Sequence, residues 1–337
     1  MRTTLRVAAL GAAATALASA TPEARACSVC LAGDPVFSGQ GTTAQQAGDL
    51  SLYFEARGWR KTSGALPHEE EGAHAEETHD HAHEHGEEEA DERARSQRLD
   101  LYVAWTPLDR LTLTLDVPYA FNKIVETEAG EETRSTLTGL GDVALFGSAV
   151  VWRNREVLPD TWLEARAMLK TPTGRDERKV DGRRDPHLQT GTGSWDFGFG
   201  LAGTHRRAWG SLWASVFWRE NTEGALDYEY GDNLLANLGV ELPLGHALPG
   251  RGLDWLTPGF ELNFRYAGFD RQAGERYRDS GGSILYATPS LRMRLPFRIR
   301  ERSPSLRAAV QIPTTQDWLH GSQHEREVWS LGILLPL

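Results

Sequence analysis

The residues of this 337-residue chain that could do chemistry gather in one acidic, histidine-rich stretch. Between His68 and Glu92 lie six of the eleven histidines and twelve of the forty-seven acidic residues, with no Lys or Arg. The candidate metal ligands are His68, His74, His79, His81, His83 and His85. Imidazole nitrogens beside carboxylates suit zinc, nickel, cobalt or copper better than calcium or magnesium. Because the stretch has few apolar residues, we expect many weak, interchangeable sites; an acidic loop that binds metal only incidentally is the alternative.

Two cysteines form a second candidate metal site. Cys27 and Cys30 are the only cysteines, and Leu31 follows them where a c-type haem motif needs His. In an oxidising compartment a local disulfide is the simpler expectation. A thiolate site for a soft metal such as copper or zinc is the alternative. Neither interpretation requires a cofactor.

The N-terminus predicts export. Arg2 and Arg6 precede an apolar, Ala-rich run, and two small-x-small cleavage motifs end at Ala20 and Ala26. We therefore expect residues 1–26 to be a signal peptide, cleaved after residue 20 or 26. Residues 27–48 then form a periplasmic segment that carries the two cysteines. The apolar run is too short to span a bilayer as a helix.

Charge and motif content exclude two classes of function. Without the twelve acidic residues of the histidine-rich stretch, the formal net charge changes from -11 to +1, so no basic surface for nucleic acid is expected. No metalloprotease HExxH, hydrolase GxSxG, P-loop or complete dinucleotide fingerprint occurs, so we do not expect an enzyme. The remaining histidines form no ligand motif and are expected at the surface: His187, His205, His246, His320 and His324.

The rest of the chain alternates apolar and polar residues with the period of a β-strand. Leu111, Leu113 and Leu115, for example, alternate with Thr112 and Thr114. About twelve such segments follow one another, which run over residues 50–57, 98–105, 111–122, 142–151, 163–170, 195–201, 212–219, 234–242, 260–266, 285–295, 306–312 and 327–337. An even number of strands lets both termini lie at one rim.

The connections between these segments predict a barrel in a membrane. Long polar connections such as 126–136 and 173–190 alternate with short turns such as 206–210, although 245–255 is an exception. Long loops at one rim and short turns at the other are typical of outer-membrane barrels, which close because lipid tolerates no unpaired strand edge. We expect an all-β, transmembrane antiparallel β-barrel of about twelve strands over residues 49–337, with residues 61–95 as a His/Glu-rich external loop. A soluble β-sandwich or lipocalin-like barrel is the competing fold.

Two sets of side chains should mark the faces of this barrel. Charged residues inside the alternation should point into a polar interior: Asp116, Glu164, Asp196, Arg219, Glu241 and Arg265. Tryptophans near strand ends should form girdles at the membrane interfaces: Trp59, Trp105, Trp162, Trp209, Trp255 and Trp329.

Four short motifs resemble a known family of outer-membrane barrels. They are Asp116-Val117-Pro118-Tyr119, Gly139-Leu140-Gly141-Asp142-Val143, Leu169-Lys170-Thr171-Pro172-Thr173-Gly174, and Leu188-Gln189-Thr190-Gly191-Thr192-Gly193-Ser194-Trp195-Asp196. Together they are similar to the transporter family called "MetA-pathway of phenol degradation", from about Leu50 to the C-terminus. The resemblance implies an outer-membrane barrel with a transport role. The chain departs from such barrels in ending with Leu337, where an aromatic residue is usual.

These observations predict a channel or transporter for small solutes in the outer membrane of a Gram-negative bacterium, with membrane lipid and small solutes or metal ions as partners. Its external loop would gather divalent transition-metal ions at the pore mouth. One alternative is a barrel for small aromatic or apolar solutes. Another is a surface metal-binding or sensing protein whose closed barrel is only an anchor.

Overall fold

The computed structural model describes residues 46–62, 91–128, 131–180, 185–276, 280–315 and 324–337. The expected signal peptide and most of the expected periplasmic segment lie outside these residues. Among the described residues, no helix is long and apolar enough to cross a membrane.

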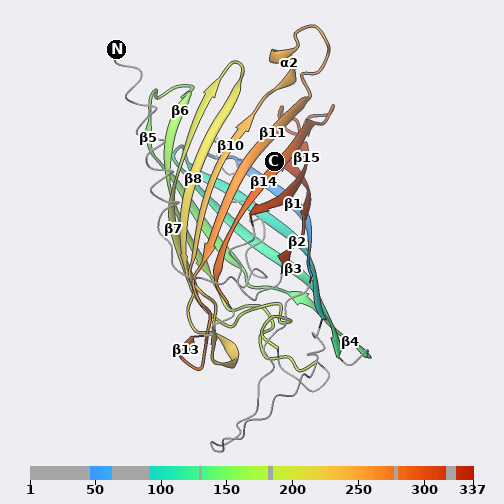
Figure 1. Ribbon diagram of the computed structural model, residues 1–337. Coiled ribbons are helices and arrows are strands. Elements are labelled where there is room, and N and C mark those ends of the chain that lie inside the picture. The colour runs from blue at the N-terminus through green and yellow to red at the C-terminus, as the bar shows by residue number, and fades with distance from the viewer. Residues whose placement is uncertain (1–45, 63–90, 129–130, 181–184, 277–279, 316–323) are drawn as a thin grey trace, which may run out of the picture.

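Twelve long antiparallel strands form one closed barrel (Figure 1). They are β1 (Leu50–Thr62), β2 (Asp91–Leu108), β3 (Leu111–Glu128), β5 (Ala144–Arg153), β6 (Thr161–Lys170), β7 (Asp196–Arg207), β8 (Gly210–Glu220), β10 (Asn233–Glu241), β11 (Leu256–Ala267), β14 (Gly282–Arg294), β15 (Ser305–Thr315) and β17 (Val328–Pro336). Each pairs with its neighbours in sequence, and β1 pairs with both β2 and β17, which closes the sheet. The prediction of a twelve-stranded antiparallel barrel is confirmed.

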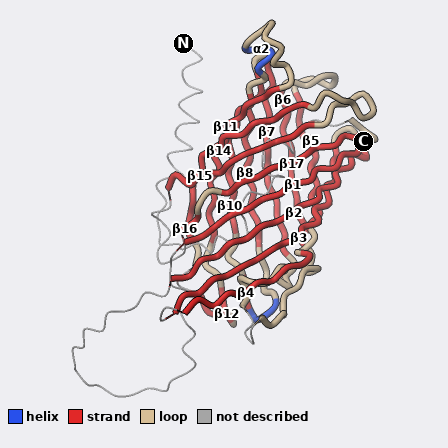
Figure 2. The backbone as a smooth tube through the Cα atoms, turned by 90° about the vertical axis from the view of Figure 1, so that its right-hand side faces the viewer, coloured by secondary structure: helices blue, strands red, loops and turns tan. Residues whose placement is uncertain are grey.

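Short elements extend the wall or lie in its connections. They are β4 (Glu131–Leu140), η2 (Ala225–Asp227), β9 (Tyr228–Glu229), α2 (Leu244–Ala247), β12 (Arg271–Gln272), β13 (Glu275–Arg276) and β16 (His324–Glu325). Figures 1 and 2 place α2 at one end of the barrel and β4 at the other. The C-terminus returns to the start of β1, where the Leu337 amide donates to the Leu50 carbonyl at 2.8 Å.

Two expected loops are shorter than the sequence pattern suggested. Most of the predicted polar loop 126–136 is strand, because β3 and β4 continue as a hairpin paired from Tyr119–Leu140 to Glu128–Glu131. The ends of the expected loop 61–95 are also strand, since β1 extends to Thr62 and β2 begins at Asp91. A strand of polar residues can continue beyond the membrane, because its backbone N–H and C=O groups pair with the neighbouring strand there too.

The two faces of the wall have opposite chemistry. Leu201 is 59% exposed on the outer face, whereas Asp116 and Asp196 are each 1% exposed within the barrel. The other large apolar side chains that alternation places outside, and that are exposed, include Phe54, Leu99, Leu115, Leu145, Leu163, Phe197, Phe199, Leu212, Val216, Leu238, Phe260, Leu262, Ile312 and Leu331. An apolar outside and a charged inside are what a barrel in lipid requires.

Four of the six tryptophans predicted to form interfacial girdles are exposed. Trp105 and Trp209 are exposed near short turns, Trp255 is exposed beside the longer β10–β11 connection, and Trp329 is exposed on β17. Trp59 and Trp162 are buried, so their assignment to a girdle is wrong. Each stands two residues from a lumenal charge, Arg57 and Glu164 respectively, and therefore shares the inner face of its strand.

Inside the wall, aromatic rings pack against glycines of neighbouring strands. The Trp213 indole covers Gly239, and the Tyr53 phenol covers Gly332. A Cβ at either glycine would clash with the ring above it. These contacts fix the strand register from the inside, as aromatic cover of strand glycines does in sheets.

Replacing Gly239 with Val should therefore destabilise the barrel by about 1–3 kcal/mol, because the Trp213 ring must leave its site. Urea unfolding followed by tryptophan fluorescence would measure this change. Gly147→Val is the matched control, since a Cβ at Gly147 meets only Leu113, at 3.9 Å. Equal destabilisation of the two variants would contradict the packing role of Gly239.

Candidate functional site in the barrel interior

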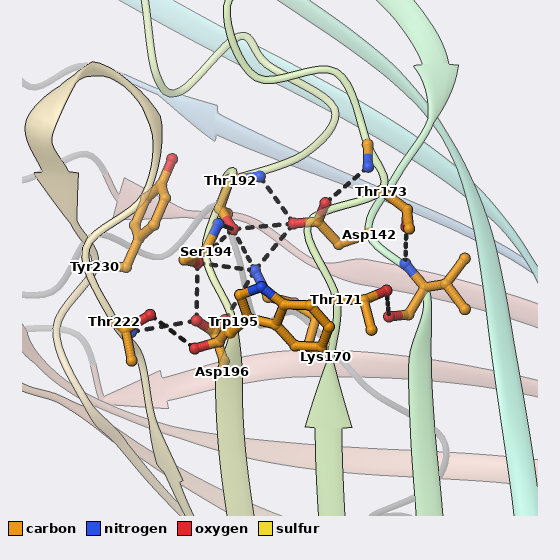
Figure 3. A network of polar contacts seen from close by, with 12 residues as sticks. Asp142, Lys170, Thr171, Thr173, Thr192, Ser194, Trp195, Asp196, Thr222 and Tyr230 are labelled. Atoms are coloured by element: carbon orange, nitrogen blue, oxygen red, sulfur yellow. Dashed lines mark hydrogen bonds and ion pairs between the residues drawn. The ribbon is translucent and has the colours of Figure 1, made fainter.

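Asp142 organises the interior at the point where the wall is interrupted. β4 ends at Leu140 and β5 begins at Ala144, so residues 141–143 leave the ladder. One carboxylate oxygen of Asp142 accepts the Gly174 amide at 2.9 Å, and the other accepts the amide and hydroxyl of Thr192 at 2.8 and 2.9 Å (Figure 3). Asp142 thus ties both ends of the β6–β7 connection to the wall.

Lys170, the last residue of β6, joins Asp142 to a second carboxylate. Its ammonium lies 2.9 Å from Asp142 and 2.9 Å from Asp196, the first residue of β7. Asp196 also pairs with Arg219 of β8 at 2.6 Å and accepts the Ser194 hydroxyl at 2.8 Å. These groups are buried or nearly so, and each charge has an opposite partner, as buried charges require.

Close backbone approach explains the glycines of this connection. A Cβ on Gly174 would lie 2.6 Å from the Cα of Gly191, so the two ends of the segment touch where neither residue has a side chain. Gly193 has a φ of +73°, which glycine adopts without steric cost. Three of the motifs that carry the family resemblance therefore meet in one network.

The β6–β7 connection packs against the inner side of the β3–β4 hairpin. Leu188 is buried with Ile124 of β3 and Leu137 of β4. The Asn122 side chain donates to the Leu188 and Gln189 carbonyls at 3.2 and 2.9 Å. An apolar contact and two hydrogen bonds thus fix the connection to the barrel interior.

An aromatic cluster joins the β6–β7 connection to the β8–β10 connection. His187 lies edge-on to Tyr228 and Tyr230, with ring centroids 5.5 and 6.1 Å apart. The Tyr230 hydroxyl donates to the Pro186 carbonyl at 3.0 Å. The expectation that His187 is a surface residue is wrong, because it lines an interior cavity. The sequence places His187 in the long polar connection 173–190 and carries no signal that this connection enters the barrel.

A cavity of about 130 Å3 lies between the wall and the β6–β7 connection. Arg57, Arg98, Lys170 and Arg219 contribute charged groups to its lining. Its apolar lining includes Trp59, Phe146, Met168 and Tyr230. The cavity is therefore amphipathic, with cations and aromatic rings in the same space.

Ion pairs continue from the cavity along the inner wall. Arg57 of β1 pairs with Asp100 of β2 at 2.6 Å, and Arg98 of β2 pairs with both Asp100 and Asp116. Further pairs lie on the opposite strands, between Arg292 and Glu241 at 2.5 Å and between Arg307 and Glu261 at 2.8 Å. The partners stand on the same, adjacent or next-but-one strands, so the pairs follow the wall.

The six charged residues predicted to face inwards do so. Asp116, Glu164 and Asp196 are buried in the interior. Arg219 and Glu241 form the ion pairs above, and the Arg265 guanidinium lies 5.0 Å from the centre of the Tyr286 ring. This part of the sequence prediction is confirmed.

Asp270 joins the connections that follow β8 and β11, outside the spanning strands. Its carboxylate accepts the Tyr228 hydroxyl at 2.5 Å and the Gly231 amide at 2.7 Å, while its own amide donates to the Ser280 hydroxyl at 2.8 Å. Burial nevertheless raises the pKa of Asp270 above the ordinary aspartate value, because desolvation outweighs these hydrogen bonds.

The Asp270 junction should weaken as pH rises. A carboxyl whose pKa is higher in the folded than in the unfolded state stabilises fully below its unfolded pKa of about 4, and this stabilisation is lost as pH rises through the folded pKa. Hydrogen exchange at the Gly231 amide, corrected for its intrinsic pH dependence, should accelerate over that range. Asp270→Asn should flatten this profile; identical profiles in both proteins would contradict the assignment.

Comparison with known proteins bears on the fold alone. No family model matches the chain, and no curated protein matches it. The crystal structure of the COG4313 outer membrane channel from Pseudomonas putida F1 is similar over 87% of this chain and 97% of that one, with a TM-score of 0.55 and 15% identity. The fold is that of an outer-membrane β-barrel.

Two further structures are similar to this barrel at a lower level. The translocator domain of the autotransporter NalP from Neisseria meningitidis aligns over 87% of this chain and 90% of its own, with a TM-score of 0.43 and 10% identity. A Pseudomonas aeruginosa FadL homologue aligns over 86% and 89%, with a TM-score of 0.39 and 12% identity. The closed wall and apolar outer face place the protein in the outer membrane. Its resemblance to the "MetA-pathway of phenol degradation" family stays a prediction.

The predicted metal ligands all lie outside the described residues. They are Cys27, Cys30, His68, His74, His79, His81, His83 and His85. Within the part of the chain that the structure describes, no group of three or more His, Cys, Asp or Glu side chains is arranged to hold a metal ion. The interior network and cavity are therefore the site that the described structure offers.

Proposed function

We propose that this barrel is an outer-membrane channel through which small solutes pass without an energy source. The observation that carries the proposal is the charged inner wall, whose ion pairs form between strands of the same side, as Arg57–Asp100 and Arg219–Asp196 do. Pairs that follow the wall do not link opposite strands, whereas pairs across the barrel would close it. We expect no enzymatic role.

Planar-bilayer recording tests this proposal. Purified, heat-modifiable protein should give discrete conductance steps in KCl, and proteoliposomes should swell in small sugars. The matched control is the same protein boiled before reconstitution. Intact barrels that neither conduct nor swell would contradict the channel and favour a barrel that acts only as an anchor.

The metal-gathering role of residues 68–92 is a separate proposal. Its support is position, since β1 ends at Thr62 and β2 begins at Asp91, at the rim where long connections lie and which faces the cell exterior in such barrels. Zinc, copper, nickel or cobalt would bind to neutral imidazoles, so binding should weaken as pH falls through the ordinary histidine range. Conductance that responds to zinc in the full chain but not after deletion of 68–90 would support this role; equal responses would contradict it.

A further inference from the structure

The interior cavity presents more positive than negative charge. Four cationic side chains line it, against the two carboxylates Asp116 and Asp142. Asp100 and Asp196, which pair with Arg57 and Arg219, do not line it. The Arg57 and Arg219 side chains thus line the cavity, whereas the carboxylates that pair with them do not.

Two of these cations keep hydrogen-bonding capacity for a ligand. Arg98 pairs with Asp100 and Asp116, yet its side chain is 25% exposed, in contrast to the fully buried Asp100 carboxylate. The Arg219 side chain lines the cavity and is 14% exposed, although it pairs with Asp196. A guanidinium that protein carboxylates already orient is a preorganised donor for a further carboxylate.

The apolar lining supplies the other half of a binding site. Trp59, Phe146 and Met168 are each less than a tenth exposed and line the cavity, with Tyr230 beside them. Aromatic rings bind other rings through stacked or edge-on contacts. A cavity of about 150 Å3 in another protein binds benzene, so the volume of about 130 Å3 here suits one ring.

We propose that this cavity binds a single-ring organic anion, of the class of aromatic carboxylates, as it passes through the barrel. The carboxylate would bind Arg98 or Arg219, and the ring would pack against the apolar part of the lining, which includes Phe146 and Met168. This inference rests on the proposed channel function and names its solute class. A neutral ring would leave the cationic donors without an acceptor, and an aromatic cation would meet like charge.

Equilibrium dialysis tests the site on the full chain in detergent, with detergent-only blanks. The probes are benzoate, benzyl alcohol, benzylamine and acetate. We expect benzoate to bind with a Kd about tenfold or more below those of the other three, because only benzoate supplies both ring and anion. Equal binding of benzoate and benzyl alcohol, or tighter binding of benzylamine, would overturn the proposal.

One pair of variants locates the site. Arg98→Gln should weaken benzoate binding about tenfold or more, because a charge-assisted hydrogen bond is lost. Arg292→Gln is the matched control, since Arg292 is also a partly exposed interior arginine with a carboxylate partner, but it does not line the cavity. Equal loss in both variants would overturn the assignment. A heat-modifiable gel band confirms that each variant is folded, and the ligand series on the unaltered chain tests the site independently of both.

Conductance measurements distinguish failure of the proposed binding site from failure of the proposed channel. KCl conductance with no selective benzoate binding would refute the site and leave the channel. Selective benzoate binding in a barrel that never conducts would refute the channel and leave the site. If the channel and the binding site are both present, benzoate should reduce the KCl conductance of the unaltered chain saturably.

Discussion

Leu201→Arg should prevent stable insertion of the barrel in lipid. Leu201 lies in the middle of β7, is 59% exposed on the outer face and has Phe197 and Phe199 on the same face. An arginine on the lipid face near the bilayer midplane costs about 2–4 kcal/mol, and less near the interfaces. Urea titration of the barrel in phospholipid vesicles should show this loss, and the unboiled gel band of the folded barrel should weaken.

Two controls separate lipid contact from other effects of that substitution. Leu201→Ala removes the side chain without adding charge and should cost far less, since the outer face has no tightly packed neighbours. Val157→Arg adds the same charge at a residue that is 78% exposed in the β5–β6 turn, and should have little effect. A Leu201→Arg barrel as stable in vesicles as the unaltered protein would show that this face does not contact lipid.

Local alternation made the wall predictable from the sequence. A strand in lipid must place an apolar side chain outside at every second residue, so twelve segments and their inward charges could be assigned without long-range information. The same alternation predicts that two of the six tryptophans point inwards. Trp59 shares its face with Arg57, and Trp162 with Glu164, so both rings point into the barrel although each lies near a strand end.

The β3–β4 hairpin shows where alternation of apolar and polar residues is insufficient to predict a strand. Its outer part carries Glu126, Glu132 and Arg134, so it has the composition of a loop, but backbone pairing continues to Glu131. Ile124 and Leu137 hold it through Leu188 of a different connection. Such a contact joins residues about sixty positions apart, and no local pattern encodes it.

The interior site was only indirectly visible in the sequence. Asp142, Lys170, Gly174, Gly191 and Gly193 belong to the motifs of the family resemblance, which implies no role for any of them. Their role arises from convergence, since Asp142 binds Gly174 and Thr192 at opposite ends of one connection. The cavity likewise depends on the inward path of that connection. The histidine-rich stretch was conspicuous in sequence because composition alone marks it, whereas the cavity-lining residues come from separate strands.

Asp142→Ala should release the β6–β7 connection from the wall and widen the interior. The substitution removes the acceptor of the Gly174 and Thr192 amides and one of the two carboxylates that pair with Lys170. Removing one partner of a buried ion pair costs about 3–5 kcal/mol, which is enough to free the two ends of the connection that Asp142 holds. Single-channel conductance should rise several-fold, and trypsin should cut at Arg175 and Arg178 in the folded barrel.

The control for this variant is Asp160→Ala, which removes an aspartate of the β5–β6 turn at the opposite rim. Asp160 also bonds to neighbouring side chains, including Thr161 at 3.2 Å, but it contacts neither the cavity nor the β6–β7 connection. Its loss should leave conductance and the trypsin pattern unchanged. If Asp142→Ala instead conducts like the unaltered barrel and resists trypsin at the same sites, the Asp142 network does not hold the connection. The width of the interior would then depend on the Leu188 contact and the two Asn122 hydrogen bonds.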